Sequence, residues 1–102
     1  MTERYNGWTN YETWCANLWL DEEGNYWREE AQNVASQQGY DRENSVYELS
    51  CVMESYYEEY APATNGMYAD LLNASMSRIN WYEIAGHYVD EVLEDRPDEI
   101  EE

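Results

Sequence analysis

Residues 41–62, DRENSVYELSCVMESYYEEYAP, contain the clearest structural signal in the chain. Successive apolar residues are separated by 3, 4, 3 and 4 positions, which places them on one face of an α-helix: Val46, Leu49, Met53, Tyr56 and Tyr60. The helix should end near Ala61, because a residue that precedes a proline is disfavoured in helical conformation. The stretch therefore predicts a long amphipathic helix that starts near Asp41.

Two further helices have recognisable N-terminal signals. Thr9 with Glu12 forms a capping-box pattern, and Asn80 with Glu83 repeats it in an asparagine form. Apolar stripes follow both signals, comprising Tyr11, Trp14, Cys15, Leu18 and Trp19 in the first case and Trp81, Ile84, Ala85, Tyr88, Val89 and Val92 in the second. We expect helices after both caps.

The remaining helices are bounded by glycine and asparagine. One should run from Asn25 or Tyr26 to Gln38 and stop at Gly39, and another should open at Asn65-Gly66. Their apolar residues are Tyr26, Trp27, Ala31, Val34 and Ala35 in the former and Met67, Leu71, Leu72 and Met76 in the latter. No segment alternates as a half-buried strand does. The prediction is an all-α, compact single-domain bundle of about five helices over residues 1–95, with a frayed acidic tail at 96–102.

The charge of the chain is extreme. It has 23 acidic residues against five arginines and no lysine in 102 residues, a formal net charge of -18. Acidic chains usually stay disordered when they lack aromatic residues, but this chain has five Trp and eleven Tyr. We therefore expect a folded protein whose surface charge is not neutralised.

The acidic residues fall opposite the apolar stripes of the third and fifth predicted helices. Most have no Lys or Arg at i+4, although such pairs stabilise a helix by a few tenths of a kcal/mol. We expect these faces to bind a partner, through Glu48, Glu54, Glu58, Glu59, Glu83, Asp90 and Glu94.

This charge density resembles that of nucleic acid. Duplex DNA has one negative charge per roughly 1.7 Å of axis, so about 18 charges correspond to about 30 Å of duplex. The leading hypothesis is a non-enzymatic anti-defence inhibitor that mimics DNA and blocks the basic DNA-binding site of a CRISPR effector or restriction enzyme. Direct nucleic-acid binding is not expected, because the five arginines are scattered. The sequence leaves a homodimer open.

The alternative is a generic acidic helical interaction module, salt-adapted or regulatory, without DNA mimicry. Acid-rich and lysine-poor surfaces are also found in proteins adapted to high salt. A fold that needs molar salt would favour this alternative.

Signals for an enzyme, a metal or a cofactor are missing from the sequence, and we expect none of the three. His87 is the only histidine, and neither a zinc-ligand motif nor a phosphate-binding loop with its lysine occurs. Residues 21–25, DEEGN, lack the ligand spacing of an EF-hand. Without an apolar span or a secretory signal pattern, we expect a cytoplasmic protein and no membrane partner.

Several single residues have structural interpretations. His87 should lie on the surface or at its boundary. Cys15 and Cys51 should be reduced and buried, since no export signal accompanies them. Trp14, Trp19, Trp81 and most of the helical tyrosines are assigned to the core.

Residues 5–14, YNGWTNYETW, resemble the opening of a family of small, largely uncharacterised phage, plasmid and prokaryotic proteins with an NGWxNYETW signature. Residues 17–21 (NLWLD), 68–72 (YADLL) and 80–85 (NWYEIA) are similar to further parts of that family. The resemblance implies a mobile-element setting, and it supplies neither catalytic residues nor a cofactor.

Overall fold

The structure is a computed structural model that describes residues 4–23 and 25–94. In these ranges the chain forms five helices and no strand, which confirms the predicted all-α fold. The helices are α1 (Tyr11–Asp21), α2 (Tyr26–Gln37), α3 (Arg42–Glu59), α4 (Gly66–Ser77) and α5 (Trp81–Glu94). The predicted tail, residues 96–102, lies outside the described residues.

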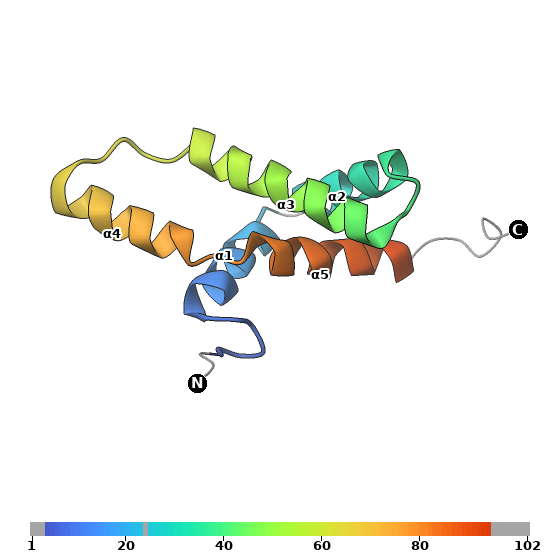
Figure 1. The fold of residues 1–102 in the computed structure, drawn as a ribbon, viewed down its shortest axis with the longest axis horizontal. Helices are drawn as coiled ribbons and strands as arrows, with labels where there is room; N and C mark the ends of the chain where they lie inside the picture. Colours follow the sequence, from blue (N-terminus) through green and yellow to red (C-terminus); the bar gives the residue numbers. More distant parts are fainter. Residues whose placement is uncertain (1–3, 24, 95–102) are drawn as a thin grey trace, which may run out of the picture.

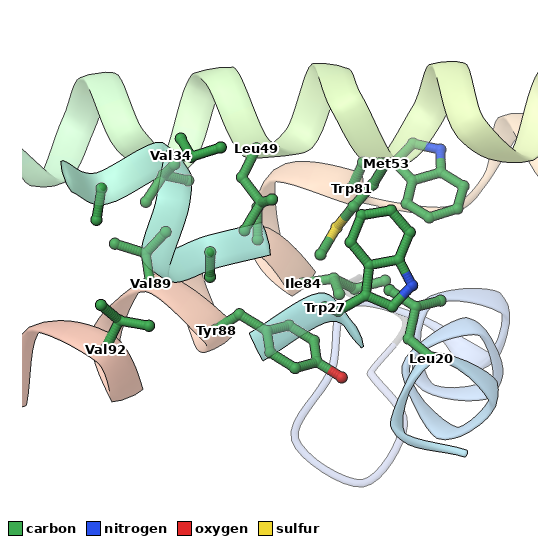
Figure 2. Close-up of a cluster of buried hydrophobic side chains, with 14 residues drawn as sticks. Leu20, Trp27, Val34, Leu49, Met53, Trp81, Ile84, Tyr88, Val89 and Val92 are labelled. Atoms are coloured by element: carbon green, nitrogen blue, oxygen red, sulfur yellow. The ribbon is translucent and has the colours of Figure 1, made fainter. Parts of the chain in front are cut away.

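The core lies between α2, α3 and α5. Helices α3 and α5 run antiparallel and share the most extensive contact, and α2 packs against both (Figure 1). The predicted stripe of α5 is confirmed, because all six of its members are buried. They meet Trp27, Val34, Leu49 and Met53 from the other two helices, as Figure 2 shows. Burial of apolar side chains at about 1.5–3 kcal/mol each makes this cluster the main stabilising element.

A local turn connects α2 to α3. Gly39 has a φ of 67°, and the amide of Tyr40 donates to the carbonyl of Ala35 at 2.7 Å while the Gly39 amide donates to Ser36 at 3.2 Å. This is the hydrogen-bond pattern of a Schellman motif, which confirms Gly39 as the helix stop. Asp41 then caps α3 by accepting from the Asn44 amide at 2.9 Å.

Helix α1 is joined to the junction of α4 and α5 by buried polar groups. Its N-cap is Asn10, whose side chain accepts from the Thr13 amide at 2.9 Å. The side-chain amide of Asn10 also donates to the Arg78 backbone carbonyl at 2.9 Å. The backbone amide of Asn80 donates to the Thr13 hydroxyl at 2.9 Å. The predicted cap at Thr9 was one residue early, because tertiary hydrogen bonds favour Asn10.

Helix α4 stands apart from the packed helices. It has no buried residue and extends away from the ends of α3 and α5, at the left of Figure 1. The molecule is accordingly elongated, with extents of 56 × 32 × 22 Å. Its radius of gyration is 15.2 Å, whereas about 13 Å is typical of a 100-residue domain. The apolar stripe predicted for this helix is therefore largely uncovered.

Candidate functional site

The outward side of α3 is lined with carboxylates. Glu43, Glu48, Glu54, Glu58 and Glu59 are all exposed and lie opposite the buried stripe of the helix. We call these five residues the acidic face of α3. From the first to the last they span about 24 Å at 1.5 Å per residue, an average of one charge per roughly 6 Å. One strand of DNA has a charge every 3.4 Å, so this face has somewhat more than half the linear charge density of one DNA strand.

The arginines of the described ranges are engaged elsewhere. Arg28 pairs with Glu91 at 2.6 Å, Arg42 with Asp90 at 2.7 Å, and Arg78 with Glu12 at 3.1 Å. Arg4 donates to the carbonyl of Gly7 at 2.7 Å. Among residues 4–23 and 25–94, no arginine or histidine lies within ion-pair distance of the acidic face of α3. Within these ranges, the closest counter-charge to this face is Arg42, which neighbours Glu43 and has its ion pair with Asp90.

The acidic residues of α5 are in a different situation. Glu83 accepts a hydrogen bond from the Thr9 amide at 3.1 Å and so fixes the N-terminal segment. Asp90 accepts two hydrogen bonds from Arg42, at 2.7 and 3.1 Å, and these, with the guanidinium charge, lower the pKa of its carboxyl group. Glu94 is exposed. Two of the three predicted α5 residues thus take part in holding the fold together.

A buried glycine, Gly86, lies beneath the Arg42–Asp90 pair. A Cβ placed on Gly86 would lie 3.4 Å from a terminal nitrogen of Arg42. The guanidinium group therefore crosses α5 directly above Gly86 and reaches Asp90 one turn later. Ion pairing across helices replaces the i+4 pairing that the sequence lacks.

The predicted partner-binding residues do not form one compact group. Glu54, Glu58 and Glu59 lie in the C-terminal half of α3, whereas Asp90 lies beside the N-terminus of that helix through Arg42. The two positions are about 20 Å apart along α3 at 1.5 Å per residue. The α3 residues thus share the exposed side of one helix, and Asp90 is separate from those in its C-terminal half.

Sequence reasoning did not find a second surface, which we call the apolar end: residues 5–20 and 60–82, including α1 up to Leu20 and the whole of α4. Its large apolar side chains are exposed, with exposed fractions of 48% for Tyr11, 65% for Trp19, 66% for Met67, 72% for Tyr68 and 58% for Leu71. The signal was present in the sequence, because these two ranges contain only Glu12 and Asp70 as acidic residues.

Several core assignments were consequently wrong. Trp19 is exposed, and so are Tyr60 at the C-cap of α3 and five helical tyrosines: Tyr11, Tyr26, Tyr47, Tyr68 and Tyr82. Trp81 is buried as predicted, whereas Trp14 is only partly buried. These side chains have the right helical spacing, but the described part of the chain leaves them largely uncovered; Tyr26, for example, contacts Tyr56 of α3 only along one side and is 42% exposed.

A groove of about 370 Å³ lies between α1 and α4. One wall is formed by α1 and includes Tyr11, Cys15 and Trp19. The other is formed by Ser75 and Met76 of α4 and by Ile79, which follows that helix. Tyr57 and Trp81 also line the groove. A second hollow of about 290 Å³ separates α4 from α3 and shares Tyr57, Met76 and Trp81. Helix α4 is therefore flanked by space on both sides.

Tyr57 lies where the groove meets the core. Its hydroxyl accepts from the Trp27 indole and donates to Glu23, both at 3.3 Å, and its ring stacks on Trp81. Burial, with the nearby Glu23 charge, raises the pKa of Tyr57 to about 12. This side chain is a neutral structural bridge at physiological pH.

The described residues include no group of three or more His, Cys, Asp or Glu side chains arranged to hold a metal ion. Both cysteines are free thiols, but Cys51 is exposed and Cys15 is only partly buried, so the prediction that they are buried was wrong. His87 is exposed as predicted, and its ring packs edge-on against that of Trp8, with 5.5 Å between the ring centroids. Across residues 4–23 and 25–94, no helix is both long and apolar enough to cross a membrane.

Comparison with known proteins identifies one family. The profile of a family of unknown function, DUF7249, matches residues 1–101. No curated protein and no solved structure matches the chain.

Proposed function

The chain belongs to this family of unknown function, DUF7249, and from its charge distribution we propose that it is a non-enzymatic anti-defence inhibitor that mimics DNA. It acts in the cytoplasm of a prokaryotic host, in a phage or plasmid setting. The partner is a basic DNA-binding protein, either a CRISPR effector or a restriction enzyme. Inhibition is steric, because the protein occupies the groove that would otherwise hold DNA.

The acidic face of α3 is the observation that supports the proposal most. Its five carboxylates are exposed and together span about 24 Å along the helix axis. In the described part of the chain, no cation lies within ion-pair distance of them. A protein selected only for stability would intersperse basic residues and reduce self-repulsion. Retention of an uncompensated face is expected when a basic partner supplies the missing charges.

The acidic residues of α5 have a supporting role in this proposal. Glu83 and Asp90 hold the N-terminal segment and α3 in place, so their substitution would disturb the fold along with binding. Glu94 is exposed and remains available to the partner. We therefore assign the phosphate-like contacts mainly to Glu48, Glu54, Glu58 and Glu59.

The test is capture from a host cell lysate on the immobilised protein, followed by elution with duplex DNA or with NaCl of matched ionic strength. We expect DNA-binding proteins that duplex DNA releases more efficiently than salt alone. Binding should weaken steeply as salt rises, because it relies on charge attraction that salt screens. Capture of no DNA-binding protein would favour the generic interaction module.

A matched pair of variants localises the contact. A quadruple variant that replaces Glu48, Glu54, Glu58 and Glu59 with Gln should weaken binding roughly ten- to a hundredfold. This follows if each exposed ion pair with the partner contributes a fraction of a kcal/mol. The control removes four charges elsewhere through Glu22→Gln, Glu29→Gln, Glu30→Gln and Asp70→Asn. An equal loss in both variants would assign binding to total charge and contradict a site on α3.

A further inference from the structure

We propose that the apolar end is the interface of a two-fold homodimer, in which α4 of each copy packs into the groove between α1 and α4 of the other. The starting observation is that α4 has no buried residue in the isolated chain. Only Met76 of this helix packs against the core, and a 12-residue helix with so little packing is marginal in water, because most helical stability in proteins comes from a buried apolar face. Something must therefore cover α4.

Charge points to a second copy as the covering molecule. The apolar end carries two acidic residues, Glu12 and Asp70, and Arg78 neutralises the first at 3.1 Å. By contrast, residues 21–59 and 83–94, which we call the acidic body, carry fifteen acidic residues and two arginines. Two copies of a chain with a net charge of -18 can associate closely only where acidic residues are excluded. The groove between α1 and α4 comes close to this condition, because Glu12 is the one acidic residue that lines it and is paired with Arg78. The hollow on the other side of α4 is lined by Glu54 and Glu58, so the second copy should approach from the side of α1.

The shape of the apolar end is self-complementary. The N-terminal half of α4 presents exposed Met67, Tyr68 and Leu71, and its C-terminal half forms one wall of the groove. A two-fold axis that sets the two α4 helices antiparallel places the projecting half of each beside the hollow half of the other. An isologous interface requires this combination of projection and hollow on a single surface.

The exposed area is of the size that a dimer buries. Aromatic side chains have roughly 150–250 Å² each, so Tyr11, Trp19 and Tyr68 together expose on the order of 400 Å² at exposed fractions of 48%, 65% and 72%. Leu18, Met67 and Leu71 add roughly 200 Å², and the groove walls add more. The total approaches the ~800 Å² per partner of a standard interface and exceeds most patches on monomers.

The oligomeric state in solution tests the proposal. Light scattering on a size-exclusion column should give about 24 kDa at high protein concentration, twice the chain mass of 12.2 kDa. The dimer should persist in molar NaCl, because apolar association is not weakened by screening. This separates it from the DNA-mimic function, which uses α3 and is salt-sensitive. Failure of either proposal leaves the other standing.

Three single substitutions that add one charge locate the interface. Trp19→Glu on α1 and Leu71→Glu on α4 should each give a monomer of 12.2 kDa with unchanged helical content, since both side chains are exposed in the single chain. Tyr47→Glu is the matched control, because Tyr47 is 63% exposed on the outward side of α3. It should remain a dimer.

A wild-type chain that stays monomeric at every concentration would overturn the proposal. So would a dimer that survives both Trp19→Glu and Leu71→Glu, or one that Tyr47→Glu dissociates as readily. A monomer whose apolar end takes up another protein or a lipid vesicle would assign that surface a different occupant.

Discussion

Helices α4 and α5 have a similar share of apolar residues and opposite environments. Seven of the 12 residues of α4 are apolar, and so are eight of the 14 residues of α5. Yet α5 buries its stripe against two other helices, whereas α4 buries nothing. The same division separates the acidic body, which has most of the core and most of the charge, from the apolar end, which contributes only Leu20 and Trp81 to the buried core. Apolar content alone therefore does not determine burial; the presence of a helix on the opposite side does.

The largest expected difference between the two regions concerns two tryptophans. Trp27 in the acidic body is fully buried, so Trp27→Ala should lower the free energy of unfolding by about 3–5 kcal/mol. Trp19 at the apolar end is 65% exposed, and Trp19→Ala should change it by less than about 0.5 kcal/mol. Urea unfolding of both variants in the monomeric Leu71→Glu background measures the contrast. Equal losses would mean that α1 is covered within the single chain, and the comparison would break.

A smaller effect distinguishes the N-caps of α1 and α4. Asn10 is buried, accepts from the amide of Thr13 and donates to the carbonyl of Arg78, so Asn10→Ala should cost about 1–2 kcal/mol. Asn65 caps α4 without a side-chain hydrogen bond, and Asn65→Ala should cost only a few tenths of a kcal/mol. Denaturant midpoints of the two variants give the comparison. A larger loss for Asn65→Ala would show that α4 is better fixed than its exposure indicates.

The smallest effect concerns paired and unpaired carboxylates within the acidic body. Asp90→Asn should cost less than about 1 kcal/mol at neutral pH, since the Arg42–Asp90 pair is half exposed. Because Arg42 lowers the pKa of Asp90 below the unfolded value of about 3.9, this contribution is present above that value. It is lost as the pH falls through the folded-state pKa.

Glu48→Gln is the control for that measurement, because no cation of the described ranges lies within ion-pair distance of Glu48. Its effect should be absent or slightly stabilising, as one repulsive charge is removed. Thermal unfolding of both variants between acidic and neutral pH follows the difference. If the two behave alike at neutral pH, the Arg42–Asp90 pair contributes nothing measurable.

Much of the fold was predictable because its signals are local. Gly39 ends α2 through a turn that needs a positive φ, and the cap at Asn80 accepts from the Glu83 amide at 3.1 Å as the pattern indicated. The stripe of α5 was also correctly assigned to the core. Caps and periodicity act within a few residues, so the sequence states them directly.

The candidate site was only partly predictable. The exposed position of the α3 carboxylates follows from helical periodicity, and the structure agrees with it. The pairing of Asp90 with Arg42 could not be foreseen, because it spans 48 residues and depends on the packing of α3 against α5. The exposure of Trp19 was missed for a similar reason, since spacing identifies a face but not its neighbour.

The sequence by itself therefore determined five helices, their caps, a net charge of -18 and the side of α3 on which the carboxylates lie. Only the tertiary structure decided which apolar stripes are buried, which carboxylates are neutralised and that α4 is left uncovered. The physical reason is the range of the interactions. Helix formation depends on residues three or four positions apart, whereas burial and ion pairing depend on which helices meet, and a periodic pattern contains no information about that.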